Sequence, residues 1–281
     1  MRLQMFLVLS VVCAAVLLIT IGCVSQKGFS IETVEAQTTT QEDKLKTAKA
    51  TKRTPVIVEL FTSEGCSSCP PADKILASLD RSQQIETADV IVLSEHVDYW
   101  NRLGWTDPFS KAQFSNRQNE YSQFFKRNDV YTPQMVVDGT TEFVGGNAGK
   151  AIESIEAAAK GTKGDLTIEV VKNEKNAVEL SVKIANLPKL SAGDSAIVLL
   201  AVTEDKISTN VSRGENAGET LPHSGVVRYL QNIGSVSGDK AFAPTLVLQK
   251  DWKQNNLNVV AFVQETNSRK ILGAVKIKLA S

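Results

Sequence analysis

The chain has 281 residues, with 31 basic and 31 acidic side chains, and 42% of its residues are hydrophobic. This length suffices for one large domain or two modest domains, each with a buried core. The balanced charge and the lack of a basic run argue against a general nucleic-acid-binding protein. The absence of a Walker A motif and of a dinucleotide-binding glycine fingerprint leaves no sign of a phosphate site.

Residues 1–23 have the pattern of an export signal, because a positive charge precedes an apolar run over residues 5–22. The run approaches the length of a membrane span, so an uncleaved anchor is one alternative, but the small residues at its end favour a signal peptide. Thr20-Ile-Gly-Cys23 resembles a bacterial lipobox, with threonine where leucine is usual, and predicts lipid attachment to a membrane at Cys23. Each alternative places the body of the protein in the periplasm or the cell envelope.

Residues 24–53 are polar and rich in Thr, Gln, Lys and Glu, which predicts a disordered linker. Cys13 and Cys23 fall within the export signal, so the exported part keeps only Cys66 and Cys69. A disulfide between these two closes too small a ring to stabilise the fold much through loop entropy. Chemical reactivity therefore explains the pair better than a stapling role.

The two cysteines lie where a predicted strand turns into a predicted helix. The strand covers residues 56–61, and a helix with apolar residues at helical spacing follows over residues 72–79. Pro70 is expected as the first helical residue, and it disfavours helical geometry at Cys69. The N–H groups and the dipole at a helix start favour a thiolate, so the pair indicates a thiol–disulfide redox site in which Cys66 attacks and Cys69 resolves.

The first domain is expected to cover residues 54–161. A continuous apolar run over residues 89–96 suits a strand of a parallel sheet, and a helix or helix pair is expected within residues 109–127. After two short strands, Asn147 is expected to cap a final helix that runs through Lys160. The two short strands are residues 134–138 and 142–144.

The second domain, residues 165–281, is expected to be mostly β. Alternating apolar and polar residues at hairpin spacing suggest a small antiparallel sandwich. The expected strands are residues 166–171, 177–184, 196–202, 257–264 and 273–279. Residues 213–228 break the pattern with a polar, glycine-rich loop, which we expect to pack across the interface between the domains. Its polar set is Arg213, Glu215, Asn216 and His223.

Three motifs carry a resemblance to a known family: ELFTSEGCSSCPPAD at residues 59–73, HVDYW at 96–100 and YTPQ at 131–134. They resemble DUF1223, a family of secreted thioredoxin-like proteins named for having no established function. The resemblance implies an α/β thioredoxin-like domain followed by a mostly β, sandwich-like domain. It further implies a cis peptide bond between Thr132 and Pro133 beside the cysteines, and a buried acid, Glu59, that assists proton transfer to the resolving thiol. The alternative for Glu59 is an outward-facing acid.

His96, Asp98 and Trp100 follow the second predicted strand. Ligands bind at the carboxyl ends of the strands in open α/β sheets, so we expect these side chains, together with Thr132, to contact substrate. The alternative for His96 is a structural histidine held by hydrogen bonds.

These patterns favour an exported thiol–disulfide oxidoreductase that acts on protein or small-molecule thiols, is served by a redox partner protein, and needs neither cofactor nor metal. Pro133 would shape the substrate groove, and residues 97–129 would overlie it. Two alternatives stay open. One is a non-enzymatic envelope binding protein with a structural disulfide, which Pro70-Pro71 favours. The other is a metallochaperone that combines the thiols with a histidine.

Overall fold

The computed structural model describes residues 53–174 and 176–279, which belong to one compact unit. The predicted signal peptide, the lipidation site at Cys23 and almost all of the predicted linker lie outside these residues. Within the described ranges, no helix combines the length and the apolar character that a membrane crossing requires.

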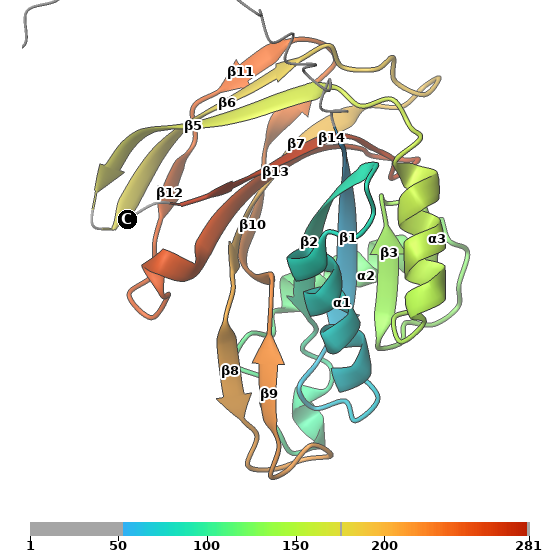
Figure 1. Ribbon diagram of the computed structural model, residues 1–281, viewed down its shortest axis with the longest axis vertical. Helices are drawn as coiled ribbons and strands as arrows, with labels where there is room; N and C mark the ends of the chain where they lie inside the picture. Colours follow the sequence, from blue (N-terminus) through green and yellow to red (C-terminus); the bar gives the residue numbers. More distant parts are fainter. Residues whose placement is uncertain (1–52, 175, 280–281) are drawn as a thin grey trace, which may run out of the picture. The chain divides into compact units, whose positions relative to one another are not determined.

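An eight-stranded mixed sheet is the main feature of this unit (Figure 1). Its strand order is β14-β13-β7-β10-β2-β1-β3-β4, in which β2 runs parallel to both β1 and β10 and the other neighbours are antiparallel. The strands are β1 (Thr54–Thr62), β2 (Ala88–His96), β3 (Gln134–Val137), β4 (Thr141–Val144), β7 (Ala196–Glu204), β10 (Val226–Val236), β13 (Leu257–Glu265) and β14 (Ile271–Lys278).

Helices cover both faces of the β1–β3 part of the sheet. They are α1 (Pro70–Ser82), α2 (Ala112–Phe124) and α3 (Ala148–Ala158). Side chains of a strand alternate between its faces, so Leu60 of β1 packs with Leu76 of α1 and Ile155 of α3. The other face carries Ile57, which belongs to one core with Phe114 of α2. Both faces of these strands are therefore buried, as their continuous apolar sequences predict.

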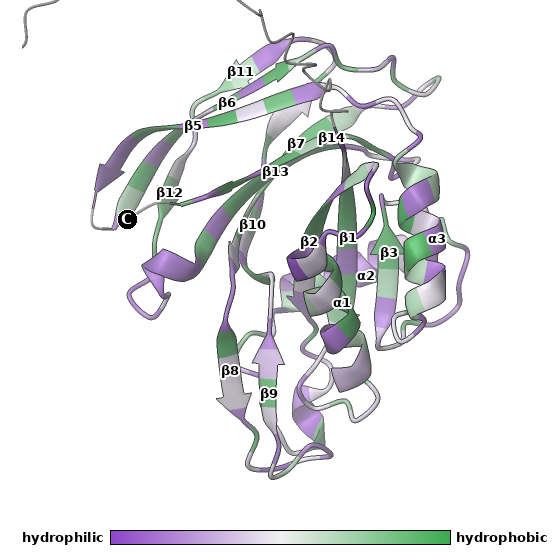
Figure 2. Ribbon diagram, in the orientation of Figure 1, coloured by the Kyte–Doolittle hydropathy of each residue, from purple (hydrophilic) through white to green (hydrophobic). Residues whose placement is uncertain are grey.

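A second sheet packs on the β7–β13 part of the first. It contains β5 (Asp165–Glu174), β6 (Ala177–Ala185), β11 (Lys240–Phe242) and β12 (Thr245–Val247). Hydrophilic and hydrophobic residues alternate along β5 and β6 (Figure 2), and their apolar faces share a core with Leu200 of β7 and Val259 of β13. Two packed sheets thus form the C-terminal part, where each strand expected from the sequence is present.

The expectation of a long polar loop over residues 213–228 is wrong. These residues include β9 (Thr220–His223), which pairs with β8 (Ile207–Asn210) in a separate two-stranded sheet, and the beginning of β10. Two short 3₁₀ helices, η1 (Asn101–Leu103) and η2 (Gln254–Asn256), complete the described elements. Because β10 pairs with β2, strands from both expected domains share one sheet.

Gly225 allows β10 to join β2. Its φ is +63°, its carbonyl accepts a 2.8 Å hydrogen bond from the Ser94 amide, and a Cβ there would lie 2.7 Å from Cγ2 of Val92. We therefore expect Gly225→Ala to lower the free energy of unfolding by about 2–3 kcal/mol, measured by urea denaturation. Gly218→Ala is the matched control, since Gly218 also has a positive φ but meets nothing within 4 Å. Equal losses in the two variants would contradict the steric part of this argument.

Candidate functional site

Cys66 and Cys69 form a disulfide between the end of β1 and the start of α1. The helix begins at Pro70, as predicted, with Cys69 as its N-cap. The expectation that Pro70 keeps Cys69 out of helical geometry is wrong: Cys69 has φ −78° and ψ −39°, and its amide donates to the Cys66 carbonyl at 3.1 Å, which closes a tight turn. Ser67 and Ser68 are exposed, whereas both cysteines are 0% exposed.

Three of the predicted site residues, Trp100, Thr132 and Pro133, lie together beside this turn. The Thr132–Pro133 peptide bond is cis, as predicted. Nε1 of Trp100 donates to Oγ1 of Thr132 at 2.8 Å, and the Trp100 side chain packs directly against the backbone of Gly65. The Pro133 carbonyl accepts from Gly145, which itself contacts the first turn of α1. Trp100, Thr132 and Pro133 therefore border the cysteine turn.

His96 is fully buried and held by an aspartate. Its Nδ1 lies 2.7 Å from Oδ2 of Asp107, which also accepts the amide of Glu64 at 2.8 Å. Burial by itself would lower the pKa of His96, but the Asp107 carboxylate, together with Asp73 and Glu64, outweighs it and the pKa is raised. The same pairing outweighs burial at Asp107, whose pKa is lowered. The structure thus shows His96 in the hydrogen-bonded arrangement that was its structural alternative.

The protein's second histidine lies against the first. The rings of His96 and His223 meet edge-to-face with centroids 4.9 Å apart, and Phe109 contacts both. Nε2 of His223 lies 3.0 Å from Oε1 of Glu64, whose Oε2 accepts from Nε1 of Trp105 at 2.8 Å. Each histidine therefore faces a buried carboxylate with one ring nitrogen.

Four polar atoms that have no hydrogen-bond partner among the described residues belong to the same region. They are Nε2 of His96, Nδ1 of His223, Oδ1 of Asp73 and Oγ1 of Thr62. Asp73 follows Cys69 by one turn of α1, and its amide donates to the Cys69 carbonyl at 3.1 Å. Burial raises the pKa of Asp73, although the two histidines act against it. A cluster of ionisable groups thus lies directly behind the disulfide.

Glu59 does not belong to this cluster. It alternates with Val58 and Leu60, which face α1, so its side chain lies on the opposite face of the sheet. There its carboxylate accepts from Nε of Arg117 and from the Tyr121 hydroxyl, both at 2.5 Å. The structure therefore does not bring Glu59 to the cysteines.

Asp98 is likewise directed elsewhere. Its Oδ1 accepts a hydrogen bond from the Ser115 hydroxyl at 2.5 Å, and its backbone amide donates to Oγ of Ser115 at 3.1 Å. These bonds fasten the loop after β2 to the first turns of α2. Asp98 thus positions the loop that carries Trp100 and does not face the disulfide.

The β8–β9 hairpin covers the cysteine turn. Nδ2 of Asn216 donates to the carbonyls of Glu64 and Cys66, at 2.8 and 3.0 Å, and the Ser67 amide donates to Oε2 of Glu215 at 2.9 Å. Gly214 packs on the Trp105 side chain, closely enough that a Cβ would lie 3.1 Å from it. Three of the four polar residues singled out in this segment, Glu215, Asn216 and His223, therefore contact the first predicted domain, as expected, whereas Arg213 is exposed.

No group of three or more His, Cys, Asp or Glu side chains within the described ranges is placed to hold a metal ion. The cysteines are joined to each other, and each histidine is engaged by a carboxylate. The metallochaperone interpretation thus finds no preformed set of ligands in this part of the chain.

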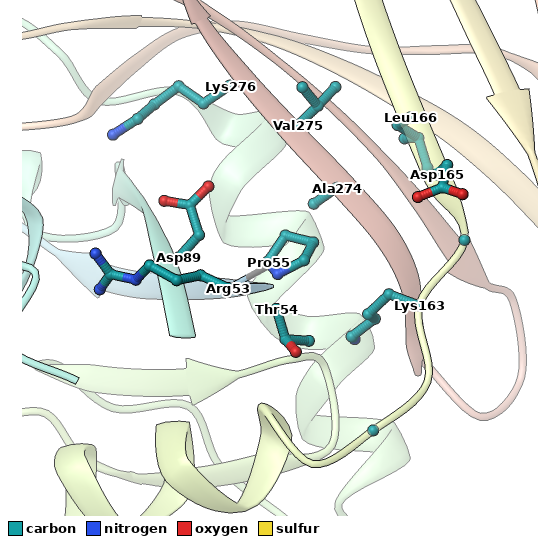
Figure 3. Close-up of a pocket in the computed structure, with 12 residues that line it drawn as sticks. Arg53, Thr54, Pro55, Asp89, Lys163, Asp165, Leu166, Ala274, Val275 and Lys276 are labelled. Carbon is teal, nitrogen blue, oxygen red and sulfur yellow. The ribbon is translucent and has the colours of Figure 1, made fainter. Parts of the chain in front are cut away.

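A cavity of about 500 Å³ lies at the far end of β1 (Figure 3). It borders Thr54, so the length of β1 separates it from the cysteine turn by about 26 Å, at 3.3 Å per residue. The cations that line it already have partners: Arg53 bonds backbone carbonyls, Lys163 bonds Asp138, and Lys276 bonds Asp80. This cavity is therefore separate from the cysteine site.

Sequence reasoning missed the acids that surround the disulfide. Glu64 and Asp73 both lie inside the motif that contains the cysteines, two residues before Cys66 and four after Cys69, so their proximity to the pair was a usable signal. Asp107 comes from a loop, and nothing in the local sequence distinguishes it from a solvated polar residue.

Two bacterial proteins are among the solved structures that resemble this fold. The crystal structure of protein AGR_C_4864 from Agrobacterium tumefaciens matches with a TM-score of 0.66 and 25% identity, over 82% of this chain and 96% of the other. HBP35 of Porphyromonas gingivalis matches with a TM-score of 0.59 and 16% identity, over 81% and 76% of the two chains. No curated protein matches the sequence. The family model described as a protein of unknown function, DUF1223, matches residues 57–264, and the chain therefore belongs to the DUF1223 family.

Proposed function

We propose that the chain is an exported thiol–disulfide oxidoreductase that works through Cys66 and Cys69. The observation that carries this proposal is the disulfide itself, which joins β1 to the start of α1 and has a cluster of ionisable groups behind it. A ring of this size contributes little to stability through loop entropy, so a chemical role explains it better. The proposed partners are protein or small-molecule thiols and a redox partner protein.

The arrangement around the cysteines supports a thioredoxin-like interpretation of residues 54–161. In that interpretation β1, α1, β2, β3, β4 and α3 form the core, and the loop with Thr132 and Pro133 borders the substrate site. Residues 97–129 are an insertion, whose loop borders the cysteine turn through Trp100 and whose helix α2 packs on the opposite face of the sheet. The predicted signal peptide and lipid attachment at Cys23 would place this site in the periplasm or the cell envelope.

The proposed reaction is a two-step exchange. A substrate thiolate attacks Sγ of Cys66, a mixed disulfide forms, and Cys69 leaves as a thiolate that takes up a proton. A second substrate thiol then displaces Cys66, so the substrate is oxidised to a disulfide and the pair is reduced to two thiols. The dipole of α1 would stabilise the thiolate, although Pro70 and Pro71 supply no N–H groups to it.

Trapping of the mixed disulfide tests this function. We expect Cys69→Ser to accumulate a covalent adduct with an oxidised, disulfide-containing substrate. The Cys66 thiolate attacks the substrate disulfide, one substrate sulfur leaves as a thiolate, and no thiol remains at position 69 to resolve the mixed disulfide. Non-reducing electrophoresis and mass spectrometry would detect the adduct, and Cys66→Ser is the matched control that should form much less. An active pair should also have a reduction potential between roughly −120 and −270 mV. No adduct and a much lower potential would refute the proposal.

The full burial of both cysteines favours a second candidate function, a non-enzymatic envelope binding protein that keeps the pair oxidised. Structural disulfides of exported proteins have potentials below about −300 mV. The measured potential therefore separates the two candidates even when no substrate is known.

A further inference from the structure

We propose that the β8–β9 hairpin is a hinged cover over the Cys66–Cys69 disulfide, and that an extended peptide takes its place when the site reacts. Both cysteines are 0% exposed although the serines between them are exposed, and Glu215 and Asn216 at the tip of the hairpin bond the backbone of this same turn. The choice of a peptide as the occupant rests on the proposed function. The cover itself does not.

The hairpin is built to move as a unit. β8 and β9 pair only with each other among the described strands, so no sheet hydrogen bonds tie them to the main sheet. In Figure 1 the hairpin extends beyond the main sheet and lies along α1, and contacts between β9 and α1 agree with this view. Its attachment to the rest of the protein therefore depends on side chains and on its two ends.

Both ends of the hairpin have backbone suited to a hinge. Lys206 precedes β8 with φ +54°, and Gly225 follows β9 with φ +63°. Asp205 joins the two ends to the main sheet, because its Oδ1 accepts from the Gly225 amide at 2.7 Å and its Oδ2 accepts from Nδ2 of Asn258 at 2.7 Å. Rotation about these ends would lift the tip of the hairpin and leave the main sheet in place.

The closed position is held by polar contacts at the tip and by apolar side chains along the strands. Asn216 and Glu215 bond the backbone of the cysteine turn, and His223 bonds Glu64. Ile207, Leu221 and the adjoining Val211 are each less than 8% exposed. The hairpin is therefore closed at rest, and it opens only when these contacts break.

The groups that the tip satisfies indicate what replaces it. Asn216 supplies N–H donors to the carbonyls of Glu64 and Cys66, and Glu215 supplies an acceptor to the Ser67 amide. An extended peptide offers alternating N–H donors and carbonyl acceptors, so its backbone can satisfy all three groups as the hairpin leaves. A small thiol without a backbone would leave some of them unpaired.

Reduction kinetics of the oxidised full-length protein test the cover without any assumption about turnover. In wild type, the rate of disulfide loss should reach a plateau as the dithiothreitol concentration rises, because opening becomes limiting. Asn216→Ala should raise this plateau about tenfold, since it removes two hydrogen bonds from the closed state alone. Asn210→Ala is the matched control, because Asn210 bonds Thr220 inside the hairpin itself. A rate without a plateau that Asn216→Ala does not change would overturn the cover.

The occupant is tested with two thiols of similar acidity. An unstructured decapeptide with one central cysteine should reduce wild type at least about tenfold faster than N-acetylcysteine amide at equal concentration, because its backbone replaces the hairpin contacts. Equal rates would overturn the peptide as occupant. Failure of Cys69→Ser to trap any adduct would refute the oxidoreductase and leave the plateau test of the cover intact.

Discussion

Arg117→Met is expected to lower the free energy of unfolding by about 3–5 kcal/mol, because it leaves a buried carboxylate without its counter-charge. Arg117 is 8% exposed and Glu59 is 0% exposed, and the guanidinium donates to Glu59 at 2.5 Å. It also bonds Gln264 of β13 at 3.0 Å and lies over the Phe262 ring. One side chain thus joins α2 to both halves of the main sheet.

A second acid makes the charge balance of this cluster informative. Glu95 is also fully buried, and its Oε1 lies 3.5 Å from Nε of Arg117, although neither of its oxygens has a hydrogen-bond partner within the described part of the chain. Burial, and then the Glu59 carboxylate, raise the pKa of Glu95 well above its ordinary value. This shift favours the neutral form of Glu95, in which the charges of Glu59 and Arg117 balance each other. Loss of Arg117 would leave the cluster with a net negative charge.

A double-mutant cycle in urea denaturation measures this coupling. Glu59→Gln in the Arg117→Met background should recover about 1–3 kcal/mol of the loss, because the uncompensated charge disappears. Arg127→Met is the matched control, because the Arg127 side chain is 34% exposed and pairs with Asp129 and Glu142. This substitution should lower the free energy of unfolding by at most about 1 kcal/mol. If Arg117→Met cost no more than this control, Glu59 would not be a buried charge.

Strands that alternate could be predicted from the sequence, and β10 shows why others could not. Its register shifts between Val227 and Tyr229 and again between Asn232 and Gly234. Each shift changes which face the following residues occupy, so the apolar residues of β10 do not repeat with period two. The strand that connects the two halves of the sheet was therefore hidden within an apparently irregular segment.

The position of the cysteine pair could be predicted because strand, turn and helix are local features. Its surroundings could not, since Asn216 lies 150 residues from Cys66 along the chain and reaches it only through the hairpin. Glu59 illustrates a different limit. Its neighbours Val58 and Leu60 pack under α1, and only the observed packing shows that Glu59 itself must face away from the cysteines.

Asp107→Asn is expected to lower the free energy of unfolding by about 3–5 kcal/mol near neutral pH. It should also reverse the sign of the contribution that His96 makes to the pH dependence of stability. Oδ2 of Asp107 accepts from the Glu64 amide and lies against Nδ1 of His96. An asparagine that keeps its oxygen on the Phe109 amide, 2.9 Å from Oδ1, would turn its NH₂ group toward both of these nitrogens. The Glu64 amide would then be buried without an acceptor.

The sign of the pH effect follows from His96. In wild type its pKa is raised above the unfolded value of about 6.5, so its stabilising contribution is complete below that pH and is lost as the pH rises through the folded pKa. Without the Asp107 carboxylate, burial dominates and lowers the pKa of His96. The contribution is then lost as the pH falls below about 6.5. As the pH rises from about 5.5 to 7.5, the contribution of His96 should therefore lower the free energy of unfolding of wild type and raise that of Asp107→Asn.

Urea denaturation at about pH 5.5 and 7.5 measures the two slopes. His223, Glu64 and Asp73 also face His96, but they are present in both proteins, so the difference between the slopes reports mainly on His96. Asp107 itself has a lowered pKa and stays ionised over this range. In a His96→Gln background, Asp107→Asn should leave the slope unchanged. A slope change that survives His96→Gln would show that His96 is not the source of the pH dependence.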